Sequence, residues 1–187
     1  MNAIHAVRRL PLVLAVIAPA CTRGDDDAEP GASSTGESDA GASSGAGGGG
    51  FDEAAVIARA LAYRDDFTQV SDEPRASQHG LADTVQVWAS PEALMPYRAL
   101  DPAGTDAVAW SPAAMLLKEH LDAGGVVSGY TVMAQGDPDS SSDGWWWGRL
   151  DADGTVHETG QVGFCIGCHT TVAARGWAYG VPLDNRR

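Results

Sequence analysis

The alternation of hydrophobic and polar positions predicts a helix and then a first strand. In residues 51–67, hydrophobic side chains recur every three or four positions with charged side chains between them, which is typical of an amphipathic helix. Residues 72–80 are polar and contain Pro74, and this indicates a loop. Residues 84–89 then alternate between hydrophobic and polar side chains, as a strand with one buried face does.

The middle of the chain is interrupted by proline before a second strand. Because Pro91, Pro96 and Pro102 follow the first strand, we expect no more than one short helical turn there. Residues 113–121 contain good helix formers, but we interpret them as a strand, since a Gly-Gly pair and an evident strand at residues 126–134 come next.

Two further strands and a helix complete the pattern. Residues 145–150 hold three consecutive tryptophans, of which the outer two should point to one face of a strand and the middle one to the other. An Asp-Gly pair at residues 153–154 predicts a hairpin with a return strand at residues 155–157. With a short helix at residues 165–174, the fold class is α+β, mainly an antiparallel β-sheet with flanking helices and a C-terminal helix.

The N-terminus has the features of an export signal. Arg8 and Arg9 precede an uncharged run at residues 10–20 that is too short to cross a bilayer as a helix but suits a signal peptide. Cys21 follows directly, where bacterial lipoproteins carry their lipid-modified cysteine. We therefore expect residues 1–21 to be a signal peptide with lipid attachment at Cys21, the alternative being ordinary cleavage nearby.

Residues 22–50 differ in composition from the rest of the chain. They hold nine glycines, five serines and a cluster of acids but no aromatic or large aliphatic side chain, so we expect a flexible linker spanning about 30 Å. The formal net charge of −13 becomes −15 without residues 1–20, which disfavours nucleic acid and anionic membranes as partners. Residues 51–187 remain as one domain, large enough for a single core.

The most specific motif is Cys165-Ile166-Gly167-Cys168-His169. Two cysteines three positions apart, followed at once by histidine, are the attachment signature of c-type haem. The two thiols add to the vinyl groups on one edge of the porphyrin, and the histidine binds the iron as axial ligand. We therefore predict one covalent haem c on Cys165, Cys168 and His169, and a C-terminal helix that binds it.

Three other interpretations of the motif compete with haem. A zinc site needs about four ligands, and the chain has no second cysteine pair. A thioredoxin-type redox pair opens a helix in a βαβ unit, which the pattern does not predict. The third is a structural disulfide between Cys165 and Cys168.

With the haem motif, several segments resemble the cytochrome P-460 and cytochrome c′-β family over about residues 55–180. The segments that carry the resemblance are Tyr63-Arg64-Asp65-Asp66-Phe67, Val85-Gln86-Val87-Trp88, the run from Trp110 to Glu119, and Trp145-Trp146-Trp147-Gly148. The resemblance implies an antiparallel sheet with flanking helices, a homodimer, and five-coordinate haem with an open distal face. It also implies binding of nitric oxide, or oxidation of hydroxylamine in members with a lysine cross-linked to the porphyrin.

Lys118 is the only lysine of the chain and falls in the family's lysine-glutamate motif, so the resemblance makes it a candidate for that cross-link. If residues 114–120 are a strand, Lys118 shares one face with Leu116 and His120, while Glu119 lies on the other. The competing interpretation treats Lys118 and Glu119 as a solvated or paired charge couple.

A sixth iron ligand would indicate electron transfer rather than substrate binding. The candidates in the folded part are Met95, Met115, Met133, His79, His120 and His157. We expect His79 to be a turn or surface residue, His157 to be exposed and the strand methionines to belong to the core. Arg64 and Arg149 are candidates for holding the haem propionates, and Asp143 for a distal proton acceptor.

The sequence thus predicts a haem c protein with an open distal site that binds or oxidises small nitrogen species. The alternatives are a six-coordinate electron-transfer cytochrome c and a non-catalytic, tethered gas sensor. We expect a small-molecule ligand, a redox partner, and export to the periplasm or tethering at the outer membrane through lipid on Cys21.

Overall fold

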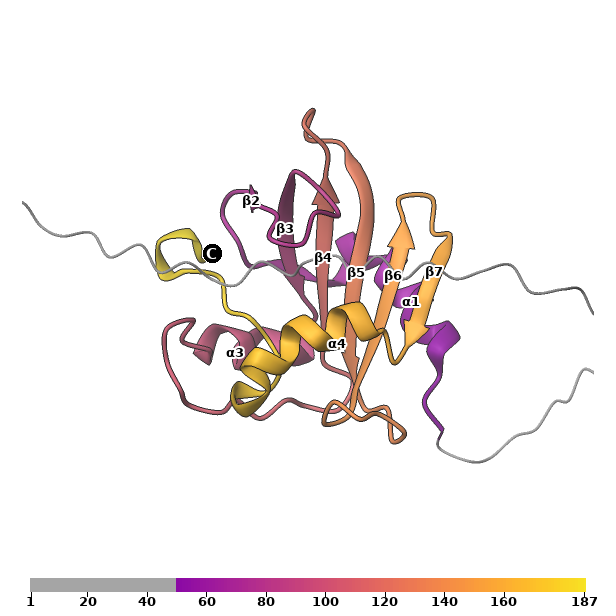
Figure 1. The fold of residues 1–187 in the computed structure, drawn as a ribbon, viewed down its shortest axis with the longest axis vertical. Helices are drawn as coiled ribbons and strands as arrows, with labels where there is room; N and C mark the ends of the chain where they lie inside the picture. The colour runs from indigo at the N-terminus through magenta and orange to yellow at the C-terminus, as the bar shows by residue number, and fades with distance from the viewer. Residues whose placement is uncertain (1–49) are drawn as a thin grey trace, which may run out of the picture.

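A computed structural model describes residues 50–187. The predicted signal peptide, the lipidation at Cys21 and nearly all of the predicted linker lie outside the described residues. Within residues 50–187 the chain forms an antiparallel sheet of seven strands with helices on both faces (Figure 1), so the α+β class is confirmed. In this described part no helix combines the length and the hydrophobicity needed to cross a membrane.

The sheet follows the predicted strands closely. Its strands run in the order β1, β3, β4, β5, β6, β7, and β2 also pairs with β3. The bounds are β1 (Thr68–Gln69), β2 (Arg75–Ala76), β3 (Thr84–Ala89), β4 (Met115–Leu121), β5 (Val127–Gln135), β6 (Trp145–Asp151) and β7 (Val156–Gly160). The strand interpretation of residues 113–121 is confirmed, because β4 lies between β3 and β5 and pairs with both from Leu116 to Leu121.

The predicted N-terminal helix forms as two consecutive pieces, α1 (Glu53–Leu61) and α2 (Tyr63–Asp66). Asp52 begins α1 by accepting a hydrogen bond from the backbone N–H of Ala55 at 3.0 Å, as an N-cap residue does. At the other end of the chain, α4 (Gly163–His169) continues into a 3₁₀ helix, η1 (Thr170–Arg175), and η2 (Leu183–Asn185) lies near the C-terminus.

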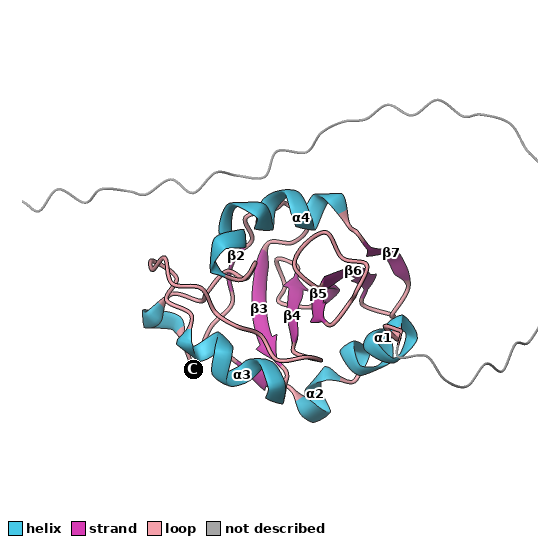
Figure 2. Cartoon of the chain, turned by 90° about the horizontal axis from the view of Figure 1, so that it is seen from below, coloured by secondary structure: helices cyan, strands magenta, loops and turns pink. Residues whose placement is uncertain are grey.

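The helices cover the two faces of the sheet with separate hydrophobic layers. Figure 2 shows α4 on one side of the sheet and α1 with α2 on the other. The core on the α4 side contains Leu116, Met133, Trp145, Trp147 and Cys165. The core on the α1–α2 side contains Met115, Leu117, Val132, Trp146 and Leu150. The predicted alternation of the three tryptophans is confirmed, and Trp146, only 1% exposed, belongs to a second core layer.

One helix contradicts the sequence prediction. Residues 91–99 form a nine-residue helix, α3 (Pro91–Ala99), rather than one short turn. Pro91 occupies the first helical position, where its missing N–H is harmless, and the Ser90 side chain caps the helix. Tyr97 is buried against the sheet, so tertiary packing outweighs the loss caused by Pro96 inside the helix.

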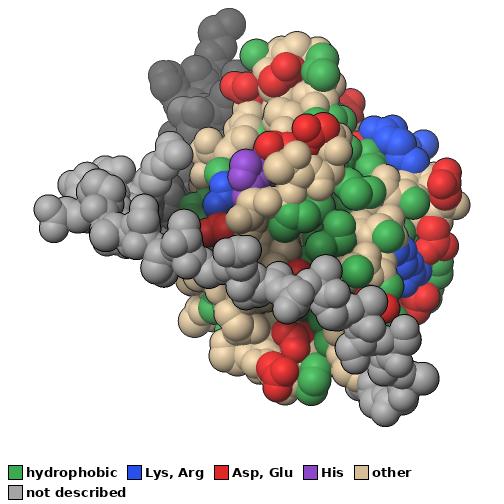
Figure 3. Space-filling view, turned by 90° about the vertical axis from the view of Figure 1, so that its right-hand side faces the viewer, with side chains coloured by type: hydrophobic (Ala, Val, Ile, Leu, Met, Phe, Trp, Pro, Cys, Tyr) green, Lys and Arg blue, Asp and Glu red, His purple; other side chains and the backbone are tan. Residues whose placement is uncertain are grey.

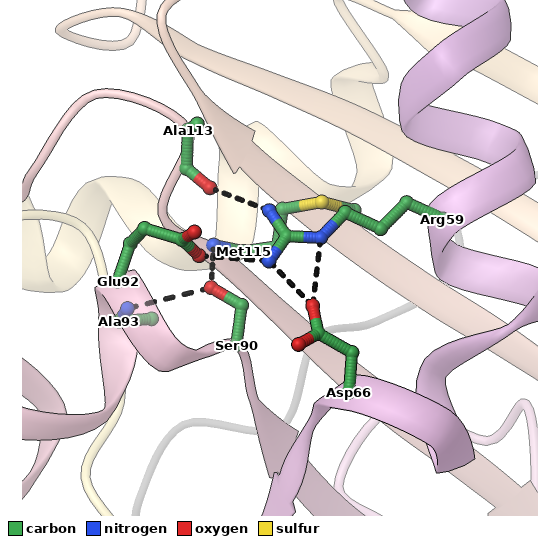
Figure 4. A network of polar contacts seen from close by, with 7 residues as sticks. All are labelled: Arg59, Asp66, Ser90, Glu92, Ala93, Ala113 and Met115. Carbon is green, nitrogen blue, oxygen red and sulfur yellow. Dashed lines mark hydrogen bonds and ion pairs between the residues drawn. The ribbon is translucent and has the colours of Figure 1, made fainter.

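A polar network joins the helices to the start of β4 (Figure 4). Arg59 of α1 donates to Asp66 at 2.6 Å, to Glu92 of α3 at 2.9 Å and to the carbonyl of Ala113 at 3.3 Å. Ser90 accepts from the backbone N–H of Met115 at 3.0 Å in the same network. These contacts fix the end of β4 from which the strand runs to Lys118.

The β7 edge of the sheet faces the viewer in Figure 3, where hydrophobic side chains gather between acidic and basic ones. β7 pairs only with β6, so its outer edge is free within residues 50–187. Val156 on this strand and Leu61 on α1 are each 43% exposed.

Candidate functional site

Most of the predicted site residues meet on the face of the sheet that α4 covers. The strand register aligns Val87, Lys118, Thr131 and Arg149 in one row across β3 to β6. The neighbouring row, of Leu116, Met133 and Trp147, is hydrophobic. This face therefore has a polar half beside an apolar half, both under the helix that carries the two cysteines.

α4 holds Cys165 against this face. Its side chain is 7% exposed and packs in the hydrophobic layer with Met133 and Trp147, and burial raises the pKa of its thiol to about 11. Cys165 is a free thiol, so the Cys165–Cys168 disulfide interpretation is contradicted. Cys168 lies one helical turn further on, with its Sγ 3.9 Å from Oη of Tyr179.

The imidazole of His169 is held in one tautomer and one orientation. Its Nδ1 lies 2.6 Å from the backbone carbonyl oxygen of Trp177, and only a protonated Nδ1 can donate to that carbonyl. Burial lowers the pKa of His169 to about 4, so the ring is neutral and Nε2 keeps its lone pair. The rings of Trp147 and Tyr179 hold the imidazole edge-on, with centroids 4.7 and 5.0 Å away.

Lys118 and Glu119 point to opposite faces of β4, so the charge-couple interpretation is contradicted. Glu119 is 3% exposed and accepts hydrogen bonds from Tyr63, Arg64 and Trp88 on the α1–α2 face. Lys118 makes no hydrogen bond or ion pair with any described residue. Burial lowers the pKa of its amine, and its charge acts on Cys165, His79 and His169.

Lys118 and His169 are deep in the protein but are not sealed. Enough protein surrounds each of them to lower its pKa through desolvation, yet each keeps part of its side-chain surface accessible.

His79 lies in a bend of the loop, as expected of a turn residue, but its side chain lies against this site rather than at the surface. Its ring centroid is 5.1 Å from that of His120 and 6.2 Å from that of Phe164. Its Nδ1 meets Ser77 at 3.1 Å, but its Nε2 is buried without a hydrogen-bond partner in the described part of the chain. Burial lowers the pKa of His79 to about 4 and that of His120 to about 3.

The remaining candidates for a sixth iron ligand lie in different parts of the structure. Met95 is 69% exposed on α3, and Met115 packs on the α1–α2 face, so neither lies on the α4 face. Met133 is buried on the α4 face as a core residue. His157 is exposed as expected and pairs with Asp151 at 2.7 Å.

The arginines also divide. Arg64 lies with Glu119 on the opposite face from α4, which contradicts its proposed propionate role. Arg149 lies on the α4 face, 5.7 Å from the ring centre of Phe164, and donates to Glu158 at 2.7 Å. Asp143 is exposed in the turn before β6, so it does not reach the site as a distal acceptor.

The donor chemistry of these residues fits a covalent haem c. Two cysteines lie one turn apart on one helix, a neutral histidine follows them with its Nδ1 proton already assigned, and the buried Nε2 of His79 lacks a partner. The zinc interpretation fits less well, because no group of three or more His, Cys, Asp or Glu side chains in residues 50–187 is arranged to hold a metal ion.

Comparisons with protein-family models, with curated proteins and with solved structures give no match to this chain, so its function has to be inferred from these residues and their geometry.

Proposed function

We propose that residues 51–187 form a c-type haem domain similar to the cytochrome P-460 and cytochrome c′-β family. Cys165 and Cys168 hold the haem through thioether bonds, and His169 is the axial ligand on α4. When bound, the haem supplies an iron that takes up nitric oxide or accepts electrons from hydroxylamine.

The single observation that carries this proposal is the state of His169. An imidazole that donates Nδ1–H to a backbone carbonyl is fixed in the tautomer whose Nε2 can bind a metal, and it becomes a stronger electron donor.

The layout of the α4 face supports the same function. The apolar row of Leu116, Met133 and Trp147 suits a porphyrin, and the polar row places Arg149 at its border, where a guanidinium can pair with a propionate. Lys118 stands in the same row, and burial lowers the pKa of its amine, which favours the neutral form that bonds covalently to carbon. If the cross-link forms, we propose hydroxylamine oxidation, and if it does not, nitric oxide binding.

A second candidate is a six-coordinate electron carrier. The observation in its favour is the unpartnered Nε2 of His79, together with His120 and Met133 on the same face. A third candidate is a haem gas sensor that binds without turnover.

The resemblance also leads us to propose a homodimer, and the first 50 residues lead us to propose export to the periplasm with lipid on Cys21. The large negative charge is consistent with a small-molecule ligand and a protein redox partner rather than nucleic acid.

The test is the intact mass of the denatured protein together with the spectrum of its ferrous form. It compares the wild type with Lys118→Ala, with Lys118→Arg as the variant that keeps the charge, and with Cys165→Ala plus Cys168→Ala. We expect the wild type to retain haem after denaturation and the double cysteine variant to lose it.

Each outcome decides between the candidates. A red-shifted ferrous spectrum that both lysine variants abolish establishes the cross-link and favours hydroxylamine oxidation. A high-spin spectrum unchanged by the substitutions leaves nitric oxide binding, and a low-spin, six-coordinate spectrum makes the protein an electron carrier. A wild type without covalent haem overturns the whole proposal.

A further inference from the structure

The Trp177 carbonyl group, which accepts the hydrogen bond from His169, belongs to a segment with unusual backbone geometry. Trp177 has φ of 68°, in the left-handed region that residues other than glycine rarely adopt. Gly176 just before it has φ of 93°. A conformation of this kind persists only where the surroundings hold it, so something must fix residues 176–177.

Two tryptophan side chains from distant parts of the chain hold this segment. The indole Nε1 of Trp110 donates to the carbonyl oxygen of Gly176 at 2.7 Å, and that of Trp145 donates to the same oxygen at 3.2 Å. Their rings meet edge to face, with centroids 5.3 Å apart. Trp145 is fully buried on β6, so the sheet itself anchors one of the two donors.

The close approach of Trp110 to the backbone also explains why residue 176 is a glycine. A Cβ on Gly176 would lie 2.6 Å from Nε1 of Trp110 and 2.6 Å from the carbonyl oxygen of Val108. Only glycine therefore admits both the left-handed backbone and the two indole donors.

Arg175 ties the same segment to the loop that carries Trp110. Its Nη1 donates to the carbonyl oxygens of Asp101, Pro102 and Gly104 at 3.3, 2.9 and 3.2 Å. The Arg175 carbonyl in turn accepts from the N–H of Val108 at 3.3 Å. The loop before β4 and the segment after η1 are thus one hydrogen-bonded unit.

We propose that Trp110 and Trp145 are positioning residues for His169, holding residues 176–177 so that the Trp177 carbonyl faces Nδ1. This inference rests on the proposed haem function. A well-placed carbonyl increases the electron donation of an axial histidine, which stabilises the oxidised iron and lowers the reduction potential. It also fixes the plane of the imidazole ring.

The test replaces the indole donors and keeps aromatic rings in place. The variants are Trp110→Phe, Trp145→Phe and the double substitution, in the full chain carrying covalent haem. Trp146→Phe is the matched control, because Trp146 is equally buried on the same strand and donates at 2.8 Å, but to Glu53 on the opposite face. The readouts are the reduction potential and the iron–histidine stretching frequency of the ferrous form.

We expect the double variant to favour the ferrous form about tenfold, an upward shift of ~59 mV for a one-electron couple. The iron–histidine frequency should fall with it, and each single variant should give an intermediate shift. Trp146→Phe should leave both readouts at the wild-type value. Gly176→Ala, which forces the indoles away from the carbonyl, should reproduce the direction of the shift.

The outcomes separate this inference from the function on which it rests. Wild-type haem with unchanged potential and frequency in the tryptophan variants overturns the positioning role and leaves the haem proposal intact. Equal shifts in Trp146→Phe and the other variants also overturn it, since general loosening of the core would then be the cause. If the double variant does not fold, the two single variants decide. A wild type that carries no haem rejects the proposed function itself.

Discussion

The two faces of the sheet differ in how the neighbouring residues Lys118 and Glu119 of β4 are paired. On the α1–α2 face, the buried carboxylate of Glu119 receives donors from a tyrosine, an arginine and a tryptophan. On the α4 face, Lys118 has no hydrogen-bond partner among residues 50–187, and the buried Nε2 of His79 has none there either. Glu119 and Lys118 are neighbours on one strand, so the strand alone does not cause the difference.

We interpret this contrast as a difference between a structural face and a face that carries the candidate site. Leaving a buried donor or acceptor unpaired costs about 1–3 kcal/mol, and folds keep such groups mainly where function uses them. The α1–α2 face, where the buried Glu119 has its hydrogen-bond partners, closes the core. The α4 side carries Cys165, Cys168, His79, His169 and Lys118, which agrees with our proposal that a haem binds there.

The substitution with the largest expected effect removes the Glu119 carboxylate, which accepts hydrogen bonds from three side chains. Glu119→Ala should lower the free energy of unfolding by about 3 kcal/mol, because it leaves three donors without their buried acceptor. Urea denaturation measures the change, and Glu158→Ala, which removes an exposed partner of Arg149, should cost less than about 1 kcal/mol. Equal effects of the two substitutions would contradict a structural role of the Glu119 network.

The histidines of the α4 face should make the protein sensitive to acid. Burial lowers the pKa of His79 to about 4 and that of His120 to about 3, and Lys118 and Arg149 face both of them. Below pH ~6.5 the unfolded chain therefore binds protons that the folded chain does not, so stability falls as the pH falls, by on the order of 2 kcal/mol per histidine at pH 5.

Unfolding curves from pH 7 to pH 4.5 test this expectation. The His79→Gln and His120→Gln substitutions should each reduce the loss of stability at low pH. If neither variant alters the loss of stability at low pH, the two rings take up protons in the folded state.

Removing the side-chain amine of Lys118 should change the free energy of unfolding in the opposite direction from removing the Glu119 carboxylate. Lys118→Leu should leave the free energy of unfolding unchanged or raise it by about 1 kcal/mol, since a buried amine without a partner is replaced by an apolar side chain. Lys118→Arg, which keeps a charge in the same place, should lower stability. A clear loss of stability in Lys118→Leu would mean that Lys118 has a bonding partner in the mature protein, as the cross-link would provide.

The smallest effect concerns Tyr63 on the α1–α2 face. Burial, followed by the hydrogen bond to Glu119, raises the pKa of Tyr63, so its contribution is present below pH ~10 and is lost as the pH rises further. Tyr63→Phe should cost about 1 kcal/mol at pH 7 and should flatten the alkaline limb above pH 10. A Tyr63→Phe protein with the wild-type alkaline limb would assign that limb to another tyrosine.

Local pattern predicted much of the fold. Alternation located β3, β5 and β6, and the three tryptophans divided between the faces as their order required, because side-chain direction in a strand depends only on its period of two. The failures have tertiary causes. The helix α3 forms across Pro96 because Tyr97 is buried against the sheet, and no local rule reports that burial.

For the candidate site, the sequence by itself supplied the proposed chemistry, because the spacing of Cys165, Cys168 and His169 is what predicts a covalent haem. It also set Lys118 on the opposite face from Glu119 once β4 was a strand. Only the tertiary structure decided which face of the sheet α4 covers. It also decided that His79 lies beside His120 and that the Trp177 carbonyl accepts a hydrogen bond from His169. The packing of His79 against His120 and Phe164 joins distant segments of the chain, and such contacts depend on the packing of whole layers rather than on any local pattern.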